Sequence, residues 1–145
     1  MFLGTYTPKV DDKGRFFLPA KFREQLAGGL VIAKGQERCL AVYTLEEFGR
    51  EAARAQSGPT TLRGSRDFQR MLAAGASEEL PDKQGRVTIP PILRRYAGLD
   101  KEIAVIGAIN RVEVWDLEAW EAYQAEQDEV FAQMDAEIFP SGDAR

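Results

Sequence analysis

The chain carries the same short pattern twice, and this repetition constrains its fold more than any other feature. Each copy reads Asp, two variable residues, Gly, Arg, three residues compatible with a β-strand, and then Pro, starting at Asp11 and again at Asp82. The two motifs are 71 residues apart, and a later pair of matching segments, at Val42 and Val114, is 72 apart. Self-similarity over a long period indicates a duplicated supersecondary unit. We therefore expect the two copies to form equivalent structures and to share one role.

Each copy is predicted to contain a strand, a turn, a strand, a short helix, two further strands and a second helix. In the first copy the turn separates a strand at Lys9 and Val10 from one at 16–18. The short helix starts at Pro19, a tolerated first position, and ends before Gly28. The apolar runs 30–33 and 40–43 follow, and a β-hairpin is their simplest arrangement.

The second helix of each copy has a recognisable start. Thr44 is a helix cap with Glu47 three residues later as its capping-box partner, and Asp116 holds the equivalent place in the second copy. The pattern breaks at 57–60 and resumes as a helix that ends near Gly75.

The last helix is predicted to be amphipathic. Its apolar spacing continues to about Ile138, burying Trp120, Tyr123 and Phe131 on one face, and the chain is expected to fray from Pro140.

These segments divide the chain into two repeats that share one core. With 145 residues, 44% of them hydrophobic, the chain is long enough to bury such a core. The expected division is a first repeat at 1–56, a linker with a helix at 57–76, a second repeat with the C-terminal helix at 77–139, and a frayed tail at 140–145.

The composition argues against several classes of function. The chain has no histidine, the commonest general base and metal ligand, and no pair of carboxylates at a catalytic spacing. Its one cysteine, Cys39, lies in an apolar run and is expected to be buried. No apolar run of about 18 residues is present, so we expect a cytoplasmic protein without a membrane span. The sequence predicts no enzyme, no metal and no cofactor.

Charge is distributed unevenly along the chain. Residues 1–112 carry 18 Lys and Arg against 13 Asp and Glu, whereas residues 113–145 carry one Arg against 10 acidic residues. A basic body with an acidic C-terminal segment could direct a positive face toward phosphate. Acidic residues that merely solvate a terminal helix explain the tail equally well.

The glycine and aspartate of each motif are expected to shape its turn. Gly14 and Gly85 can adopt the positive φ that a tight turn needs. Asp11 and Asp82 can accept hydrogen bonds from backbone N–H groups of the turn, a common role of Asp.

The arginines are better candidates for function, because a turn does not require Arg at its exit. Arg15 and Arg86 could form an Asp–Arg pair that stiffens the turn, although exposed pairs stabilise little. Alternatively, a planar guanidinium on a rigid loop can make a bidentate contact to guanine or hold a phosphate. Lys13 and Lys83 lie at different offsets from the glycine, which suits general phosphate attraction better than base reading.

These motifs, with their following segments, resemble those of a known family. The segments run Leu18-Pro19-Ala20-Lys21-Phe22-Arg23 and Ile89-Pro90-Pro91-Ile92-Leu93-Arg94. The chain resembles the MraZ family of bacterial transcriptional regulators from its first residues to Trp120. The resemblance implies an α+β fold of tandem, pseudo-symmetric β-α-β repeats, AbrB-like and double-split, around a β-barrel-like core with peripheral helices. Pro81, which lacks an N–H group, is expected at an edge or unpaired position.

The same resemblance implies a function. It predicts a nucleoid-associated protein that assembles into homo-oligomeric rings and binds double-stranded DNA at short direct repeats in promoters, upstream of the division and cell-wall gene cluster and of its own gene. Arg15 and Arg86 would be the signature arginines, Asp11 and Asp82 their acidic partners, and Lys13 a flanking basic residue. A small-molecule substrate is not expected.

Two other classes of function remain open at this stage. The protein could be a ring-forming scaffold in which the motifs are ordinary turns. It could also be an enzyme using Asp11 or Asp82 as an acid or base, but no second catalytic group converges on either carboxylate in the sequence.

Overall fold

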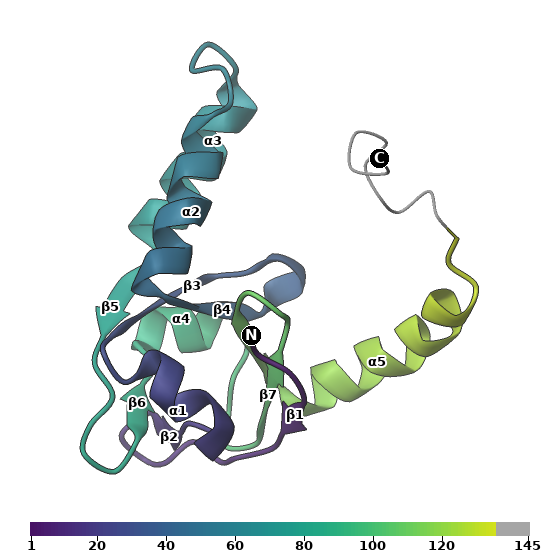
Figure 1. Cartoon of the computed structure of the whole chain (residues 1–145). Helices are drawn as coiled ribbons and strands as arrows, with labels where there is room; N and C mark the ends of the chain where they lie inside the picture. Colours follow the sequence, from purple (N-terminus) through teal and green to yellow (C-terminus); the bar gives the residue numbers. More distant parts are fainter. Residues whose placement is uncertain (136–145) are drawn as a thin grey trace.

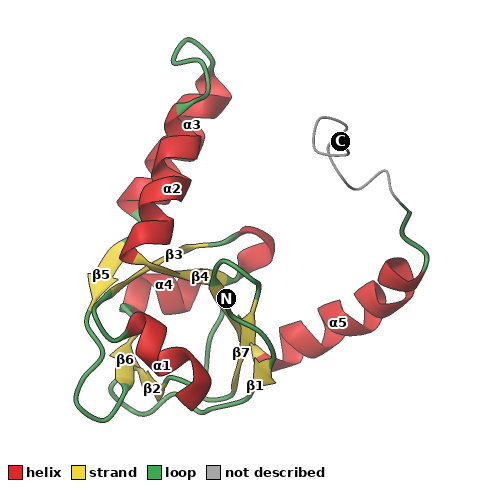
Figure 2. Cartoon of the chain, in the orientation of Figure 1, coloured by secondary structure: helices red, strands yellow, loops and turns green. Residues whose placement is uncertain are grey.

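The computed structural model describes residues 1–135 and shows an α+β fold (Figures 1 and 2). Within these residues, six strands form an antiparallel sheet in the order β1-β7-β8-β4-β3-β5, and β2 and β6 form a separate two-stranded ladder. The strands are β1 (Thr5–Tyr6), β2 (Arg15–Phe17), β3 (Leu30–Lys34), β4 (Leu40–Thr44), β5 (Ser77–Glu79), β6 (Arg86–Thr88), β7 (Ile103–Gly107) and β8 (Val112–Asp116).

The two copies are interleaved in the sheet. Each contributes one hairpin, β3–β4 or β7–β8, and the hairpins join where β4 pairs with β8. Each copy also lends its first strand to the other: β1 pairs with β7, and β5 pairs with β3. The tandem repeat is therefore confirmed as a pseudo-symmetric fold in which neither copy completes its sheet alone.

The ladder also joins the two copies, which corrects one expectation. We expected a strand at Lys9 and Val10, just before the turn, and another at 16–18, just after it. In the structure β2 pairs with β6, with Phe16 opposite Val87, while Lys9 forms an isolated bridge to Glu102 of the second copy. The apolar side chains explain this pairing, because Phe16 and Val87 are both 1% exposed and pack into the common core.

One core lies between the sheet, the ladder and two short helices, α1 (Ala20–Leu26) and α4 (Pro91–Tyr96). Pro19 and Pro90 are the residues just before these helices, so the first helix starts at Ala20, one residue later than expected. The sheet, the ladder and both helices contribute side chains to this core, and both copies are represented in it. Its residues include Phe16, Phe22, Leu26, Leu30, Ile32, Val42, Val87, Leu93, Val105 and Val114.

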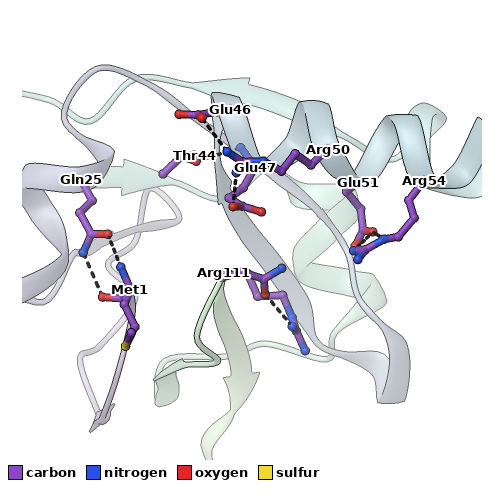
Figure 3. Close-up of polar contacts among 10 residues, drawn as sticks. Met1, Gln25, Thr44, Glu46, Glu47, Arg50, Glu51, Arg54 and Arg111 are labelled. Atoms are coloured by element: carbon purple, nitrogen blue, oxygen red, sulfur yellow. Dashed lines mark hydrogen bonds and ion pairs between the residues drawn. The ribbon is translucent and has the colours of Figure 1, made fainter. Parts of the chain in front are cut away.

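Two longer helices, α2 (Leu45–Gln56) and α3 (Arg63–Ala74), form a hairpin that projects from the sheet (Figure 1). Thr44 caps α2 as expected, its Oγ1 accepting the Glu47 N–H at 3.0 Å (Figure 3). Arg50 pairs with Glu46 and Glu47, and Arg54 with Glu51, along the exposed side of α2 (Figure 3). Phe48 of α2 and Leu72 of α3 pack with the buried residues Ala33, Ala41 and Tyr43 of the sheet.

The last helix, α5 (Leu117–Ala132), is capped as expected by Asp116, whose Oδ2 accepts the Ala119 N–H at 3.0 Å. Only its first turns contact the body, where Leu117, Trp120 and Tyr123 pack beside Trp115 and the buried Cys39.

Two expectations for α5 are wrong. Phe131 is 75% exposed instead of buried, and the helix ends at Ala132, short of Ile138. The C-terminal part of α5 extends away from the sheet (Figure 1), and no apolar surface of this chain within residues 1–135 covers Val130 and Phe131. The fraying expected from Pro140 lies outside the described residues.

Candidate nucleic acid interface

The first motif folds into a closed loop centred on the carboxylate of Asp11. Its Oδ1 accepts the backbone N–H groups of Lys13 and Arg15, both at 2.9 Å. The Asp11 N–H donates to the Arg15 carbonyl at 2.8 Å, and the Gly14 N–H donates to the Asp11 carbonyl at 3.0 Å. Gly14 has a φ of 79°, which favours glycine. The aspartate and glycine thus have the structural roles that the sequence indicated.

The second motif repeats this loop contact for contact. Asp82 Oδ1 accepts the N–H groups of Gln84 and Arg86 at 2.9 Å, and Gly85 has a φ of 80°. Pro81 lies in no strand, as its missing N–H group predicted, and leaves the loop unchanged. Since the loops have the same hydrogen bonds, they present their arginines in the same way.

These hydrogen bonds lower the pKa of both aspartates. The main cause for Asp11 is the backbone N–H of Arg15, and for Asp82 that of Arg86, with the arginine side chains adding to the effect. Both carboxylates are therefore ionised at neutral pH. A carboxylate held ionised by its own loop is a hydrogen-bond acceptor, and it cannot serve as a general acid at neutral pH.

Each motif arginine is oriented by its aspartate through only one of its side-chain N–H groups. Arg15 Nε donates to Asp11 Oδ2 at 2.8 Å, and Arg86 Nε donates to Asp82 Oδ2 at 2.7 Å. Within residues 1–135 the terminal amino groups of both arginines make no hydrogen bond. The side chains are 27% and 25% exposed. The Asp–Arg pair and a ligand-binding role are thus compatible, because the pair fixes the guanidinium and leaves its outer edge available.

The ladder brings the two arginines onto one exposed face. In register, Arg15 lies opposite Thr88 and Phe17 lies opposite Arg86, while the Phe16–Val87 pair between them points into the core. Side chains alternate along a strand, so the four outer residues share one face. Phe17 is 49% exposed, and the Arg86 guanidinium lies 6.0 Å from the centre of its ring.

The predicted lysines lie at the loops but are not equivalent. Both Lys13 and Lys83 are exposed. Lys13 donates its backbone N–H to Asp11, a position that Gln84 takes in the second loop, whereas Lys83 corresponds to Asp12. The lysines therefore flank the ladder face at different places in each loop.

Three residues of this region were not predicted from the sequence as part of the site: Phe17, Arg23 and Arg94. Phe17 is expected from the sequence only as a strand residue, although the second copy has Thr88 at the equivalent position, which is a visible asymmetry. Arg23 and Arg94 are expected from the sequence only as helix residues. Their repetition at the same offset was the available signal, but the contacts that they make, described below, cross between copies.

Comparison with known proteins identifies the family of this chain. The family model described as MraZ protein matches the chain twice, at residues 1–71 and 72–140. The transcriptional regulator MraZ of Cutibacterium acnes is 61% identical over 139 residues, covering 96% of this chain and 98% of that protein. The proteins of the same name from Kineococcus radiotolerans and Micrococcus luteus are 56% and 54% identical over 140 residues, covering 97% of this chain and 98% of each protein. The chain belongs to the MraZ family of transcriptional regulators.

Proposed function

We propose that this protein binds DNA sequence-specifically through the outer face of the β2–β6 ladder. The observation that carries the proposal is the placing of Arg15 and Arg86 on one exposed two-stranded ribbon. The major groove of B-DNA is about 12 Å wide and admits such a ribbon. The arginines are two positions apart along the strands, about 7 Å, so both can reach base edges in one groove.

The chemistry of each group suits this role. A guanidinium fixed at Nε can use its terminal amino groups to contact guanine O6 and N7, the commonest specific contact in the major groove. Lys13 and Lys83, exposed beside the ladder, suit contacts to phosphates, which position a protein without reading sequence. Asp11 and Asp82 orient the arginines and do not touch DNA.

The targets that we propose are direct repeats in a promoter, upstream of the division and cell-wall gene cluster and of the protein's own gene. Membership of a family of transcriptional regulators supports a regulatory role. The name of this family does not describe a class of enzyme. We further propose that the protein acts in the cytoplasm at the nucleoid. None of the helices within residues 1–135 has the length and apolar character to cross a bilayer.

We also propose that several copies assemble, as a ring, and bind one DNA molecule together. One ladder offers few base-reading groups, so useful affinity requires several linked contacts. Apolar side chains exposed on the projecting helices are available for contact with a second copy: Phe68, Met71, Val130 and Phe131. Each subunit would contribute the interleaved repeats 1–56 and 77–139, joined by the linker at 57–76.

The proposal is tested by a gel-shift titration of the full chain with the DNA upstream of its own gene. We expect a shift that the same DNA competes away and a shuffled sequence of equal length does not. The logarithm of affinity should fall with the logarithm of salt concentration, with a slope of about −0.9 per phosphate contact. Failure to shift this DNA, with intact oligomers, would favour the scaffold function instead.

A further inference from the structure

Two arginines outside the motifs lie against the motif loops, and each contacts the loop of the other copy. Arg94, from helix α4 of the second copy, lies over Gly14 of the first: its Cζ would be 2.8 Å from a Cβ at that glycine. Arg23, from helix α1 of the first copy, lies over Gly85 of the second, with its Nε 2.8 Å from the corresponding position. The positive φ of each loop favours glycine, and a Cβ at either position would also displace the arginine above it.

Each of these arginines is anchored at its base. Arg23 Nε donates to the carbonyl of Leu18 at 2.9 Å, and Arg94 Nε donates to the carbonyl of Ile89 at 3.1 Å. Both acceptors lie in the segment that leads into the arginine's own helix. Within residues 1–135 the terminal amino groups of Arg23 and Arg94 make no hydrogen bond, so each retains free donors next to a motif loop.

Backbone hydrogen bonds tie the same segments across the copies. The Leu18 N–H donates to the Gly85 carbonyl at 2.9 Å, and the Ile89 N–H donates to the Gly14 carbonyl at 2.8 Å. The carbonyl of Leu18 therefore holds Arg23 while its N–H holds the second loop. The anchor of each arginine and the loop beneath it form one connected unit.

We propose that each DNA-binding half-site is a composite of the two copies: the Arg86 loop acts with Arg23, and the Arg15 loop acts with Arg94. In each half-site the motif arginine reads a base, and the helix arginine supports the loop and donates its terminal amino groups to a neighbouring phosphate. The proposal rests on the proposed function, since DNA is its ligand. It predicts that functional coupling crosses between the copies.

The test is a double-mutant cycle on binding of the full chain to the DNA upstream of its own gene. Arg23→Ala alone should lower affinity about tenfold, the loss of a charge-assisted hydrogen bond. Added to Arg86→Ala, it should lower affinity by less than about threefold. Added to Arg15→Ala, it should lower affinity by the full tenfold, because only coupled residues deviate from additivity. Arg94→Ala should behave in the opposite sense.

Arg95→Ala provides a matched control, since Arg95 is the exposed neighbour of Arg94 in α4 and its side chain forms no hydrogen bond or ion pair within residues 1–135. It should leave affinity nearly unchanged. Arg23→Ala and Arg94→Ala should each reduce the salt slope by about 0.9, which a purely structural role would not do. If the wild-type protein binds DNA, three results would overturn the composite half-site: coupling between residues of the same copy, no coupling at all, or an unchanged salt slope in the Arg23→Ala and Arg94→Ala variants.

A second measurement separates this inference from the proposed function, because it needs no DNA. In a ¹⁵N NMR spectrum of the free protein, Arg23→Ala should shift the amide resonance of Gly85 and leave that of Gly14 in place. Arg94→Ala should do the reverse. If each substitution instead shifts the glycine of its own copy, the composite unit is refuted. If the expected shifts are seen in a protein that fails to bind DNA, the proposed function alone is refuted.

Discussion

Phe17 and Arg86 are register partners in the β2–β6 ladder, and the Arg86 guanidinium lies 6.0 Å from the centre of the Phe17 ring. The equivalent pair at the other end of the ladder is Thr88 with Arg15. The two loops are alike, but the face between them is not, since one end carries an exposed aromatic ring and the other a hydroxyl. The outer face of the ladder is thus asymmetric about the pseudo-two-fold axis of the repeats.

We predict that Phe17 contacts a thymine methyl group, a common apolar contact in the major groove. Phe17→Thr, which makes the two ends of the ladder alike, should weaken binding by about 1 kcal/mol, because a half-exposed ring buries only part of its surface. Fluorescence polarisation with promoter DNA checks this. Replacing thymine by uracil should weaken wild-type binding and leave Phe17→Thr unaffected; equal losses in both proteins would exclude the methyl contact.

The motif loops should be stable over all but strongly acidic pH. The folded pKa of Asp11 lies below its ordinary value of 3.8, chiefly because the Arg15 N–H stabilises the carboxylate. The stabilisation is therefore fully present above 3.8 and is lost as pH falls through the lowered pKa. The Nε–H resonance of Arg15, followed by NMR, should move only in that acidic window. In Asp11→Asn the transition should disappear, and a transition near neutral pH would contradict this account.

The position of α5 leads to a stability prediction. Trp120 packs edge-on against Trp115 with ring centres 5.3 Å apart, whereas Phe131 is 75% exposed. Trp120→Ala should lower the free energy of unfolding by about 2 kcal/mol, and Phe131→Ala by no more than about 0.5 kcal/mol. The buried Trp120 Nε1 has no hydrogen-bond partner within residues 1–135, so Trp120→Phe should cost much less than Trp120→Ala. Urea unfolding of the three variants measures these changes. Equal losses of unfolding free energy in Trp120→Ala and Phe131→Ala would show that α5 packs differently.

Spacing of the DNA repeats should matter if several subunits bind together. Subunits related by head-to-tail rotation present their ladders in the same sense, which favours direct repeats about 10–10.5 base pairs apart. Inserting about half a helical turn between two repeats should reduce affinity about 100-fold, the scale of lost avidity, and a whole turn much less. Equal losses in a gel-shift titration, or full affinity for a single repeat, would mean that one subunit suffices.

Local features of the fold could be predicted from the sequence because neighbouring residues determine them. The caps Thr44 and Asp116 needed only the following turn, and the loop of Asp11 and Gly14 needed only the five residues that it closes. The repeat itself showed that the second loop would match the first. The candidate arginines followed from the same comparison.

The pairing between copies could not be predicted in this way. A repeat shows that two segments are alike, but not whether each completes its own copy or the other, so the pairing of Phe16 with Val87 and the contact of Arg94 with Gly14 were not visible. Helical spacing likewise shows that Phe131 shares a face with Trp120, but not that the sheet ends before it can cover Phe131.

The most direct test of the central claim compares Arg15→Lys and Arg86→Lys with wild type, measuring affinity for promoter DNA and for a shuffled sequence under the same salt conditions. An ammonium keeps the charge but lacks the planar fork of a guanidinium. Each substitution should weaken promoter binding by about 1–3 kcal/mol, while binding to shuffled DNA and its salt slope stay at the wild-type values. Arg63→Lys on the projecting α3 should change neither affinity. If the Arg15→Lys and Arg86→Lys proteins discriminate between the two DNAs as well as wild type does, the ladder arginines do not read bases.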